Sequence, residues 1–254
     1  MFETLLTNWW GILIICAFSL CVWVIISALF YRVFFKRFYD MVLSALALIL
    51  LSPVFLLLIV IGAINMKGNP FFTQLRPGKN GKIFKLIKFR TMTMEKDAEG
   101  NLLPDAKRLT KYGKALRATS LDELPELINI FIGSMSIVGP RPQLVRDMVF
   151  MSDAVKLRHT VRGGLTGLAQ VNGRNNITWE EKFEYDLEYI KKITLLGDIK
   201  ILFGTVIKVA KGSDISRDGM ETDIDYGDWL LNTGKVTKEE YNLRLAKAKE
   251  LIGG

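Results

Sequence analysis

The feature that most limits how this chain can fold is an uncharged run of about 23 residues, from Trp9 to Tyr31. As an α-helix it would be roughly 34 Å long, enough to cross the hydrocarbon core of a bilayer. Only Glu3 is charged before the run, whereas a signal peptide begins with basic residues. The basic residues between positions 32 and 37 place its C-terminal end in the cytoplasm. We therefore expect an uncleaved transmembrane anchor.

A second apolar run, from Met41 to Met66, is interrupted at its centre by Ser52 and Pro53. Proline lacks the amide that would bond the carbonyl of Ile49, and its ring clashes there, so the helix must bend. Each half is then about 12 residues, or roughly 18 Å, which is too short to span a bilayer.

Basic residues flank both ends of this second run, which favours a return to the same side of the membrane. We expect a re-entrant helix-break-helix in which the Ser52 hydroxyl bonds a freed carbonyl. The alternative is an ordinary transmembrane helix kinked at Pro53.

The composition narrows the class of protein. Half of the 254 residues are hydrophobic, but the apolar excess is confined to the first quarter, as in a membrane-attached catalytic domain. The net charge of +8 suits anionic lipids or a polyphosphate substrate, and equally a solvated basic face. No basic motif is interleaved with aromatic residues, so we expect no nucleic-acid binding. Cys16 and Cys21 both lie in the first run, so neither a disulfide nor a zinc site is expected, and His159 is predicted at the surface.

The polar remainder of the chain predicts a small β-hairpin and several helices. Two strand-like segments flank a Pro-Gly and Asn-Gly turn region between residues 71 and 92. Apolar residues recur at helical spacing in residues 105–119 and 198–212, with lysines and arginines around them. These two segments are candidates for interfacial amphipathic helices, although the first could equally dock on its own core.

Asp122 and Glu123 are the acidic pair that could carry chemistry. Ser120 and Glu123 have the spacing of a capping box, which places both acids in the first turn of an apolar helix. There they could simply complement the helix dipole. They could instead act as a carboxylate nucleophile beside a carboxylate metal ligand. Arg141, fixed between two prolines, would present a guanidinium from a stiff loop, although the segment could equally be a rigid loop without a functional role.

Residues from about Phe34 to Arg217 resemble the monotopic bacterial phosphoglycosyl transferases, the bacterial sugar transferase family. The blocks that carry the resemblance are FKRFYDMVLSALALILLSP, FFTQLRPGKNGKIFKLIKFRTM, SLDELPELINIFIGSMSIVGPRP, LTGLAQVNGRN and FEYD. They look closest to the small bacillosamine-phosphate transferases. The family usually has Pro-Gly where this chain has Gly163-Gly164.

The resemblance implies transfer of a sugar 1-phosphate from a UDP-sugar to undecaprenyl phosphate, with release of UMP and a need for Mg²⁺. It implies that Asp122 is the nucleophile and Glu123 the metal ligand, and that Ser52-Pro53 is the family's helix break. It places five further residues around the phosphates and the nucleotide: Lys88, Arg117, Arg141, Arg174 and Asp198. The catalytic domain would lie on the cytoplasmic face of the bacterial inner membrane. The competing hypothesis is an inactive membrane scaffold that recruits enzymes of glycan assembly.

The expected organisation is therefore an α+β membrane-associated protein with three parts. Residues 1–33 form the anchor, and residues 34–217 form the re-entrant helix and a mostly helical catalytic domain. Residues 218–254 form a linker and a pair of short helices with a glycine-containing turn. The pair resembles the helical modules called SHOCT domains, which suggests self-association into a homo-oligomer.

Overall fold

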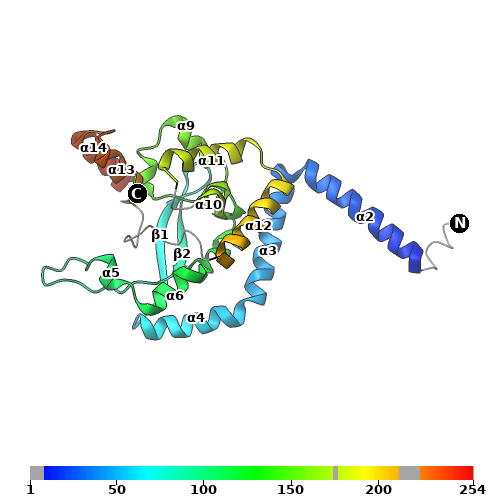
Figure 1. The fold of residues 1–254 in the computed structure, drawn as a ribbon, viewed down its shortest axis with the longest axis horizontal. Coiled ribbons are helices and arrows are strands. Elements are labelled where there is room, and N and C mark those ends of the chain that lie inside the picture. The colour runs from blue at the N-terminus through cyan, green and yellow to red at the C-terminus, as the bar shows by residue number, and fades with distance from the viewer. Residues whose placement is uncertain (1–8, 174–176, 212–223, 254) are drawn as a thin grey trace.

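The computed structural model describes residues 9–173, 177–211 and 224–253 (Figure 1). The described chain is mostly helical, as the sequence predicted, with two small sheets, of which only the β1–β2 hairpin was predicted. The strands are β1 (Phe71–Pro77), β2 (Ile83–Phe89), β3 (Met135–Val138) and β4 (Gly163–Thr166). The longer helices are α2 (Trp9–Leu29), α3 (Lys36–Leu50), α4 (Ser52–Asn65), α6 (Lys111–Thr119), α7 (Glu126–Ile132), α11 (Trp179–Lys191), α12 (Leu195–Lys211), α13 (Tyr226–Asn232) and α14 (Lys238–Gly253).

Short helical turns connect these elements. They are the π-helix η1 (Tyr31–Phe35), the 3₁₀ turns η2 (Lys79–Gly81), η3 (Leu121–Glu123) and η4 (Leu157–Thr160), and the short α-helices α5 (Asp105–Arg108), α8 (Val145–Met148), α9 (Asp153–Lys156) and α10 (Leu168–Asn172).

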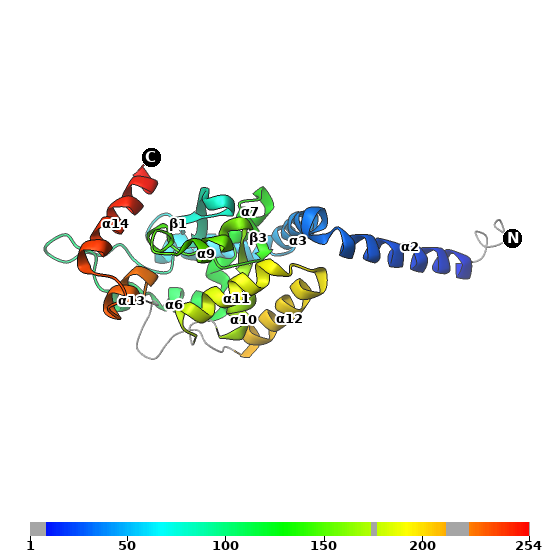
Figure 2. The ribbon, with the colours of Figure 1, turned by 90° about the horizontal axis from the view of Figure 1, so that it is seen from above.

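Helix α2 extends away from the rest of the molecule, and its side chains are almost all exposed (Figures 1 and 2). Among the described residues it is the single straight helix long and apolar enough to cross a membrane. An exposed apolar surface of this kind is consistent with a helix that lies in a membrane. The π-helix η1 joins α2 to α3.

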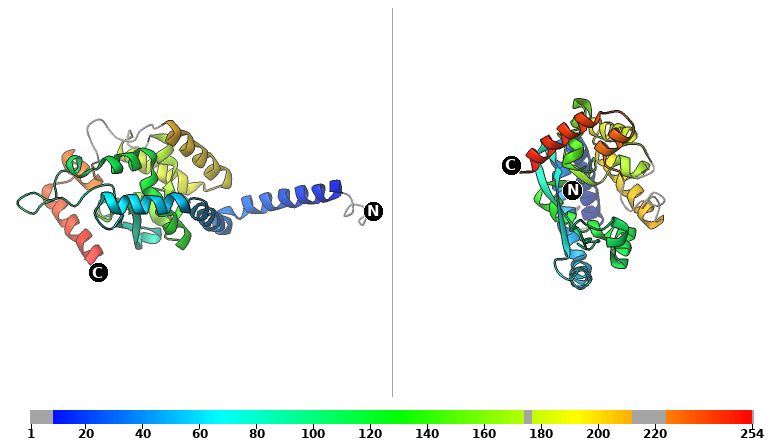
Figure 3. Two further views of the ribbon diagram at one scale, coloured as in Figure 1. Left: turned by 90° about the horizontal axis from the view of Figure 1, so that it is seen from below. Right: turned by 90° about the vertical axis from the view of Figure 1, so that its left-hand side faces the viewer.

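The second apolar run is bent, as Pro53 predicted. The helical segment Tyr31–Leu50 meets α4 at an angle of 65°. The Ser52 hydroxyl donates to the carbonyl of Ile49 at 2.8 Å, so the carbonyl that Pro53 cannot bond has a partner. Figure 3 shows α4 running along one side of the domain after this bend.

Strands β1 and β2 form the predicted antiparallel hairpin, in which Phe71 pairs with Phe89. Its inner face packs on a core that joins α4, α6 and α7, built from Leu58, Leu86, Phe89, Leu116, Leu124, Leu127, Ile130 and Met135. Helix α6 docks on this core through Leu116, and the Tyr112 hydroxyl donates to the carbonyl of Leu58 at 3.1 Å. The core-docked alternative for residues 111–119 is therefore correct on that face.

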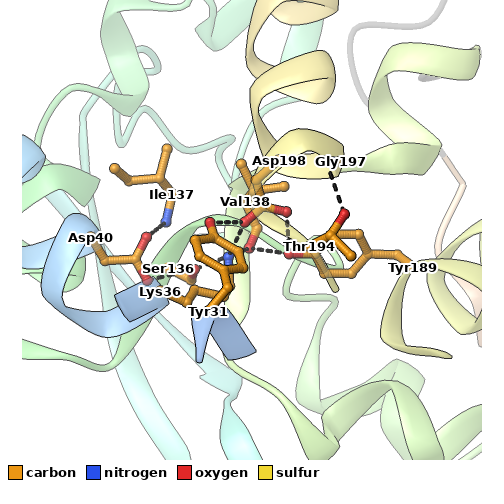
Figure 4. Close-up of polar contacts among 10 residues, drawn as sticks. All are labelled: Tyr31, Lys36, Asp40, Ser136, Ile137, Val138, Tyr189, Thr194, Gly197 and Asp198. Carbon is orange, nitrogen blue, oxygen red and sulfur yellow. Dashed lines mark hydrogen bonds and ion pairs between the residues drawn. The ribbon is translucent and has the colours of Figure 1, made fainter. Parts of the chain in front are cut away.

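The first turns of α3 are bonded to β3, which pairs in parallel with β4. The buried Asp40 carboxylate accepts hydrogen bonds from the Ser136 hydroxyl at 2.7 Å and from the amide of Ile137 at 2.9 Å (Figure 4). The Lys36 ammonium donates to the carbonyl of Val138 at 2.9 Å. Arg37 donates to the carbonyl of Ile130 at 2.6 Å, at the C-terminal end of α7, where a cation is favoured. Helix α3 is thus bonded into the same domain as β3 and α7.

The C-terminal helices α13 and α14 form the predicted pair, with Gly234 at φ +68° in the turn between them. They are docked on α8. Arg146 donates to Asp228 at 2.7 Å, and the amide of Tyr226 donates to Asp147 at 2.9 Å. The helix pair in residues 224–253 is therefore in direct contact with the preceding domain.

His159 is buried, so its predicted surface position is wrong. Its neighbour Arg158 points into the interior, where it forms an ion pair with Asp186. The 3₁₀ turn η4 holds both residues, so His159 is buried with Arg158. Burial and the adjacent Arg158 guanidinium lower the pKa of His159 to about 4, so the imidazole is neutral near pH 7.

Replacing Asp40 by Ala would leave the hydroxyl of Ser136 and the amide of Ile137 buried without an acceptor. We expect Asp40→Ala to lower the free energy of unfolding by about 2–3 kcal/mol and the melting temperature by roughly 5–10 °C. Thermal denaturation of the purified full chain in detergent measures both. Asp153→Ala, at a fully exposed aspartate with a local ion pair, serves as the control and should change stability by less than about 0.5 kcal/mol. Equal shifts for the two variants would contradict the role of Asp40.

Candidate active site

Asp122 and Glu123 lie in the 3₁₀ turn η3, between α6 and α7. The predicted capping box is wrong, because Ser120 is in the left-handed region at φ 56° and makes no side-chain cap. Helix α7 begins only after Pro125, whose fixed φ and missing amide suit the position before the first helical turn. The two acids are therefore held in a tight turn ahead of the helix.

The structure brings three of the predicted site residues into one ion-pair cluster. The Lys88 ammonium lies 2.7 Å from Oε1 of Glu123, and Nη2 of Arg141 lies 2.6 Å from the same oxygen. Both cations thus share one carboxylate oxygen. Lys88 also lies 3.1 Å from Oε1 of Glu126.

These side chains come from three separate elements: the strand β2, the turn η3 and the loop after β3. Lys88 is on β2, and the buried side chain of Asn129, on α7, is bonded to that strand. It accepts from the amide of Ile87 at 3.0 Å and donates to the carbonyl of Lys85 at 2.8 Å. Arg141 lies in the loop that follows β3. The hydrogen bonds between the Asn129 side chain and the backbone of β2 therefore set the position of Lys88 relative to the turn that holds the two acids.

The cluster separates the pKa values of the two neighbouring acids. Burial alone would raise the pKa of Glu123, but the contacts with Arg141 and Lys88 outweigh it and hold that pKa well below its usual range. The pKa of Asp122 is raised, chiefly by burial and then by the Glu123 charge, and Lys88, Arg141 and Arg117 oppose the shift. Glu123 is thus a firmly ionised carboxylate, whereas Asp122 is the more basic one.

Glu126 is a member of the cluster that was not identified from the sequence. Its side chain is 2% exposed, and burial raises its pKa to about 7 against the opposing charge of Lys88. Its Oε1 lies within ion-pair distance of Lys88 but has no partner with hydrogen-bond geometry. The only sequence signal was a third acid in the segment LDELPE, and an acid at a helix start is usually exposed.

The remaining predicted residues lie elsewhere or outside the description. Arg117 donates to the hydroxyl of Thr91 at 3.2 Å, and its charge acts on Asp122. Arg174 lies outside the described residues. Asp198 is buried in a different network, where its carboxylate accepts from Tyr31 at 2.7 Å, Tyr189 at 2.9 Å and Lys36 at 2.6 Å (Figure 4). The structure therefore does not bring Asp198 to the Glu123 cluster.

The oxygen ligands of this cluster fit Mg²⁺ held in part by a substrate. The described residues contain no group of three or more His, Cys, Asp or Glu side chains that could hold an ion by themselves. Mg²⁺ is usually bound through one or two carboxylates together with substrate phosphates and water. Glu123 and the adjacent Asp122 offer such carboxylates, and Lys88 and Arg141 offer charges for phosphate oxygens.

Comparisons with known proteins identify the family of the chain. A family model described as bacterial sugar transferase matches residues 31–212. The uncharacterized sugar transferase EpsL of Bacillus subtilis is 44% identical over 182 residues, which cover 72% of this chain and 90% of EpsL. The UDP-glucose:undecaprenyl-phosphate glucose-1-phosphate transferase of Klebsiella pneumoniae is 44% identical over 186 residues, which cover 68% of this chain and 40% of that protein. The undecaprenyl-phosphate galactose phosphotransferase of Salmonella typhimurium is 36% identical over 207 residues, which cover 73% of this chain and 41% of that protein.

Replacing Glu126 by Gln should change how stability depends on pH. Because the folded pKa of Glu126 is raised from 4.5 to about 7, folding favours its protonated form. That contribution is complete below pH 4.5 and is lost as the pH rises to about 7. We expect the wild type to lose roughly 2–3 kcal/mol relative to Glu126→Gln across this window. Melting temperatures of both proteins from pH 4 to 8 measure the difference, and parallel curves would contradict the assignment.

Proposed function

The chain belongs to the bacterial sugar transferase family, and from this premise we propose that it transfers a sugar 1-phosphate from a UDP-sugar to undecaprenyl phosphate, releasing UMP. The observation that carries the proposal is the cluster in which Lys88 and Arg141 share Glu123, beside the more basic carboxylate of Asp122. A diphosphate donor needs fixed cations, and transfer through the enzyme needs a nucleophile next to them. The names of the relatives in Klebsiella and Salmonella describe reactions of this class.

We propose that the reaction has two displacements at one phosphorus. An oxygen of Asp122 attacks the sugar-bearing phosphorus of the donor, and the bond from that phosphorus to the bridging oxygen breaks, so that UMP leaves with the electron pair. An oxygen of undecaprenyl phosphate then attacks the same phosphorus, and the aspartyl oxygen–phosphorus bond breaks. The product is undecaprenyl diphosphate sugar, and Asp122 is regenerated as a carboxylate.

Each residue of the cluster has a role in this scheme. A raised pKa makes the ionised Asp122 carboxylate a stronger nucleophile than an ordinary aspartate. Lys88 and Arg141 neutralise the charge of the diphosphate and hold the phosphorus in line with Asp122. Mg²⁺, held by Glu123 and the donor phosphates, would supply further charge neutralisation for the leaving UMP.

We propose that the bent run α3–α4 enters and leaves one leaflet. Both of its ends contact the same domain, since Lys36 donates to the carbonyl of Val138 and Arg90 donates to the carbonyl of Met66 at 2.7 Å. A straight span would put its ends on opposite sides of the bilayer. The basic residues near both ends favour the cytoplasmic face of the inner membrane. The site would then lie at the depth of the phosphate of the lipid acceptor.

Helix α12 supports the same orientation toward the membrane. Its exposed face is apolar, and the side chains at helical spacing along it are Leu196, Ile199, Phe203 and Val206. Lys208 and Lys211 lie near its end. This arrangement fits a helix that lies in the headgroup region with its apolar face in the acyl chains.

Replacing Asp122 by Asn should abolish the reaction, because the amide cannot form the aspartyl phosphosugar. We expect UMP release with undecaprenyl phosphate and Mg²⁺ to fall at least about 10³-fold. A panel that includes UDP-glucose, UDP-galactose and UDP-bacillosamine as donors identifies the sugar. Mass spectrometry of the wild type with donor alone should find the adduct on Asp122. Asp153→Asn, at an exposed site, is the control and should keep wild-type turnover.

Two results would count against this function. Normal turnover of Asp122→Asn would remove the nucleophile. A folded wild type that releases no UMP from any donor would favour the inactive scaffold.

The re-entrant path predicts that residues 32 and 82 are on one side of the membrane. In a protein whose Cys16 and Cys21 are changed to Ser, we expect Arg32→Cys and Lys82→Cys to be protected from a membrane-impermeant maleimide in intact cells. Both should react in inverted vesicles. Trp9→Cys, at the other end of α2, should show the opposite pattern. Labelling of residues 32 and 82 from opposite sides would indicate a complete crossing.

A further inference from the structure

The backbone of the loop that carries Arg141 is held by two guanidinium groups. We define the Arg141 loop as residues 139–142, between β3 and α8. Arg158 donates through Nη2 to the carbonyl of Arg141 at 2.7 Å, and Arg76 donates through Nη1 to the carbonyl of Pro142 at 3.1 Å. Two consecutive carbonyls of the loop are therefore fixed from different elements, η4 and β1.

Arg158 is itself held by Asp186 on α11. Its Nε and Nη2 donate to Oδ2 of Asp186 at 2.9 and 2.6 Å, and both side chains are almost fully buried. Its guanidinium carbon lies 5.7 Å from the centre of the Phe183 ring. A buried ion pair contributes little net stability compared with well-packed apolar residues, but its geometry is specific. The pair is therefore better suited to fixing a position than to supporting the core.

The Arg141 loop is also in close contact with the strand β4. A Cβ atom on Gly163 would lie 2.4 Å from Cγ of Pro142, and one on Gly164 would lie 2.1 Å from the amide nitrogen of Gly139. The glycines thus allow β4 to approach the loop to within backbone contact. With contacts to both β4 and Arg158, the loop has little freedom to shift.

We propose that Arg158, oriented by Asp186, is a positioning residue for Arg141 that keeps its guanidinium at the phosphate site. The inference rests on the proposed function, because it assumes that Arg141 binds the donor diphosphate. Arg158 donates to the backbone of Arg141, and the side chain of Arg141 reaches Glu123 at 2.6 Å. A displacement of about 1 Å at such a site can change a rate by up to about 100-fold.

Arg158→Lys tests the role with the least disturbance, since the ammonium keeps a charge opposite Asp186. The lysine side chain lacks the planar guanidinium, which donates to Asp186 and to the carbonyl of Arg141 at the same time. We expect kcat/KM for UMP release to fall about 10-fold. Arg244→Lys is the matched control, because Arg244 also pairs with a carboxylate and donates to backbone carbonyls, those of Val149 and Phe150. It should change kcat/KM less than about 2-fold.

A double-mutant cycle with Arg141→Met separates positioning from a general structural effect. The probe is UDP with Mg²⁺, whose diphosphate is common to all donors, and the measurement is its Kd by calorimetry. We expect Arg158→Lys to raise the Kd of UDP about 5- to 10-fold when Arg141 is present, and less than about 2-fold in the Arg141→Met protein. Its effect on the melting temperature should be the same in both backgrounds.

Equal weakening of UDP in the two backgrounds would overturn the inference and leave the proposed function standing. Unchanged kcat/KM in Arg158→Lys would do the same. A wild type that neither releases UMP nor binds UDP would overturn the proposed function, and the inference with it.

Discussion

The hydrogen bonds between the start of α3 and strand β3 are the constraint on which the rest of the structure depends. Asp40 and Lys36 bond the helix to residues 136–138, and the Arg141 loop follows directly from that strand. The direction in which the apolar run leaves the domain and the position of Arg141 are therefore fixed by one set of contacts. Because the bonded groups are buried, the loss of one partner leaves the other without a hydrogen bond. The start of α3 therefore cannot move away from β3 without a large cost in free energy.

In the candidate active site, the pKa values of the acidic side chains are set by the neighbouring charges and by burial. Glu123 and Asp122 are adjacent in sequence, yet contact with Lys88 and Arg141 lowers the pKa of one while burial raises that of the other. Opposite shifts in neighbouring acids are the usual sign of divided roles. Glu126 adds a third carboxyl below Lys88, so that the ammonium is held from two directions. Hydrogen bonds from the side chain of Asn129 to the backbone of β2 hold β2 against α7 beside it.

Features with a local cause could be predicted from the sequence, and features made by distant contacts could not. The break at Pro53, the hairpin and the C-terminal helix pair follow from the chemistry of nearby residues, and the sequence blocks pointed to Lys88, Glu123 and Arg141. The capping box failed because Pro125 displaced the helix start. The burial of Glu126 and His159, the Arg158–Asp186 pair and the network around Asp198 depend on partners far along the chain. A single sequence contains no local signal for such pairings.

The sharing of Glu123 by Lys88 and Arg141 also has a thermodynamic consequence. In the form described here, the two cations are neutralised internally, so an anion that approaches them competes with a carboxylate already in place. Any divalent ion that draws Glu123 away releases both cations, and by reciprocity an anion that engages the cations makes Glu123 available. Binding of such an ion at Glu123 and of an anion at the two cations would therefore be cooperative without a conformational change of the fold. Free orthophosphate, arriving alone, would gain little from this surface.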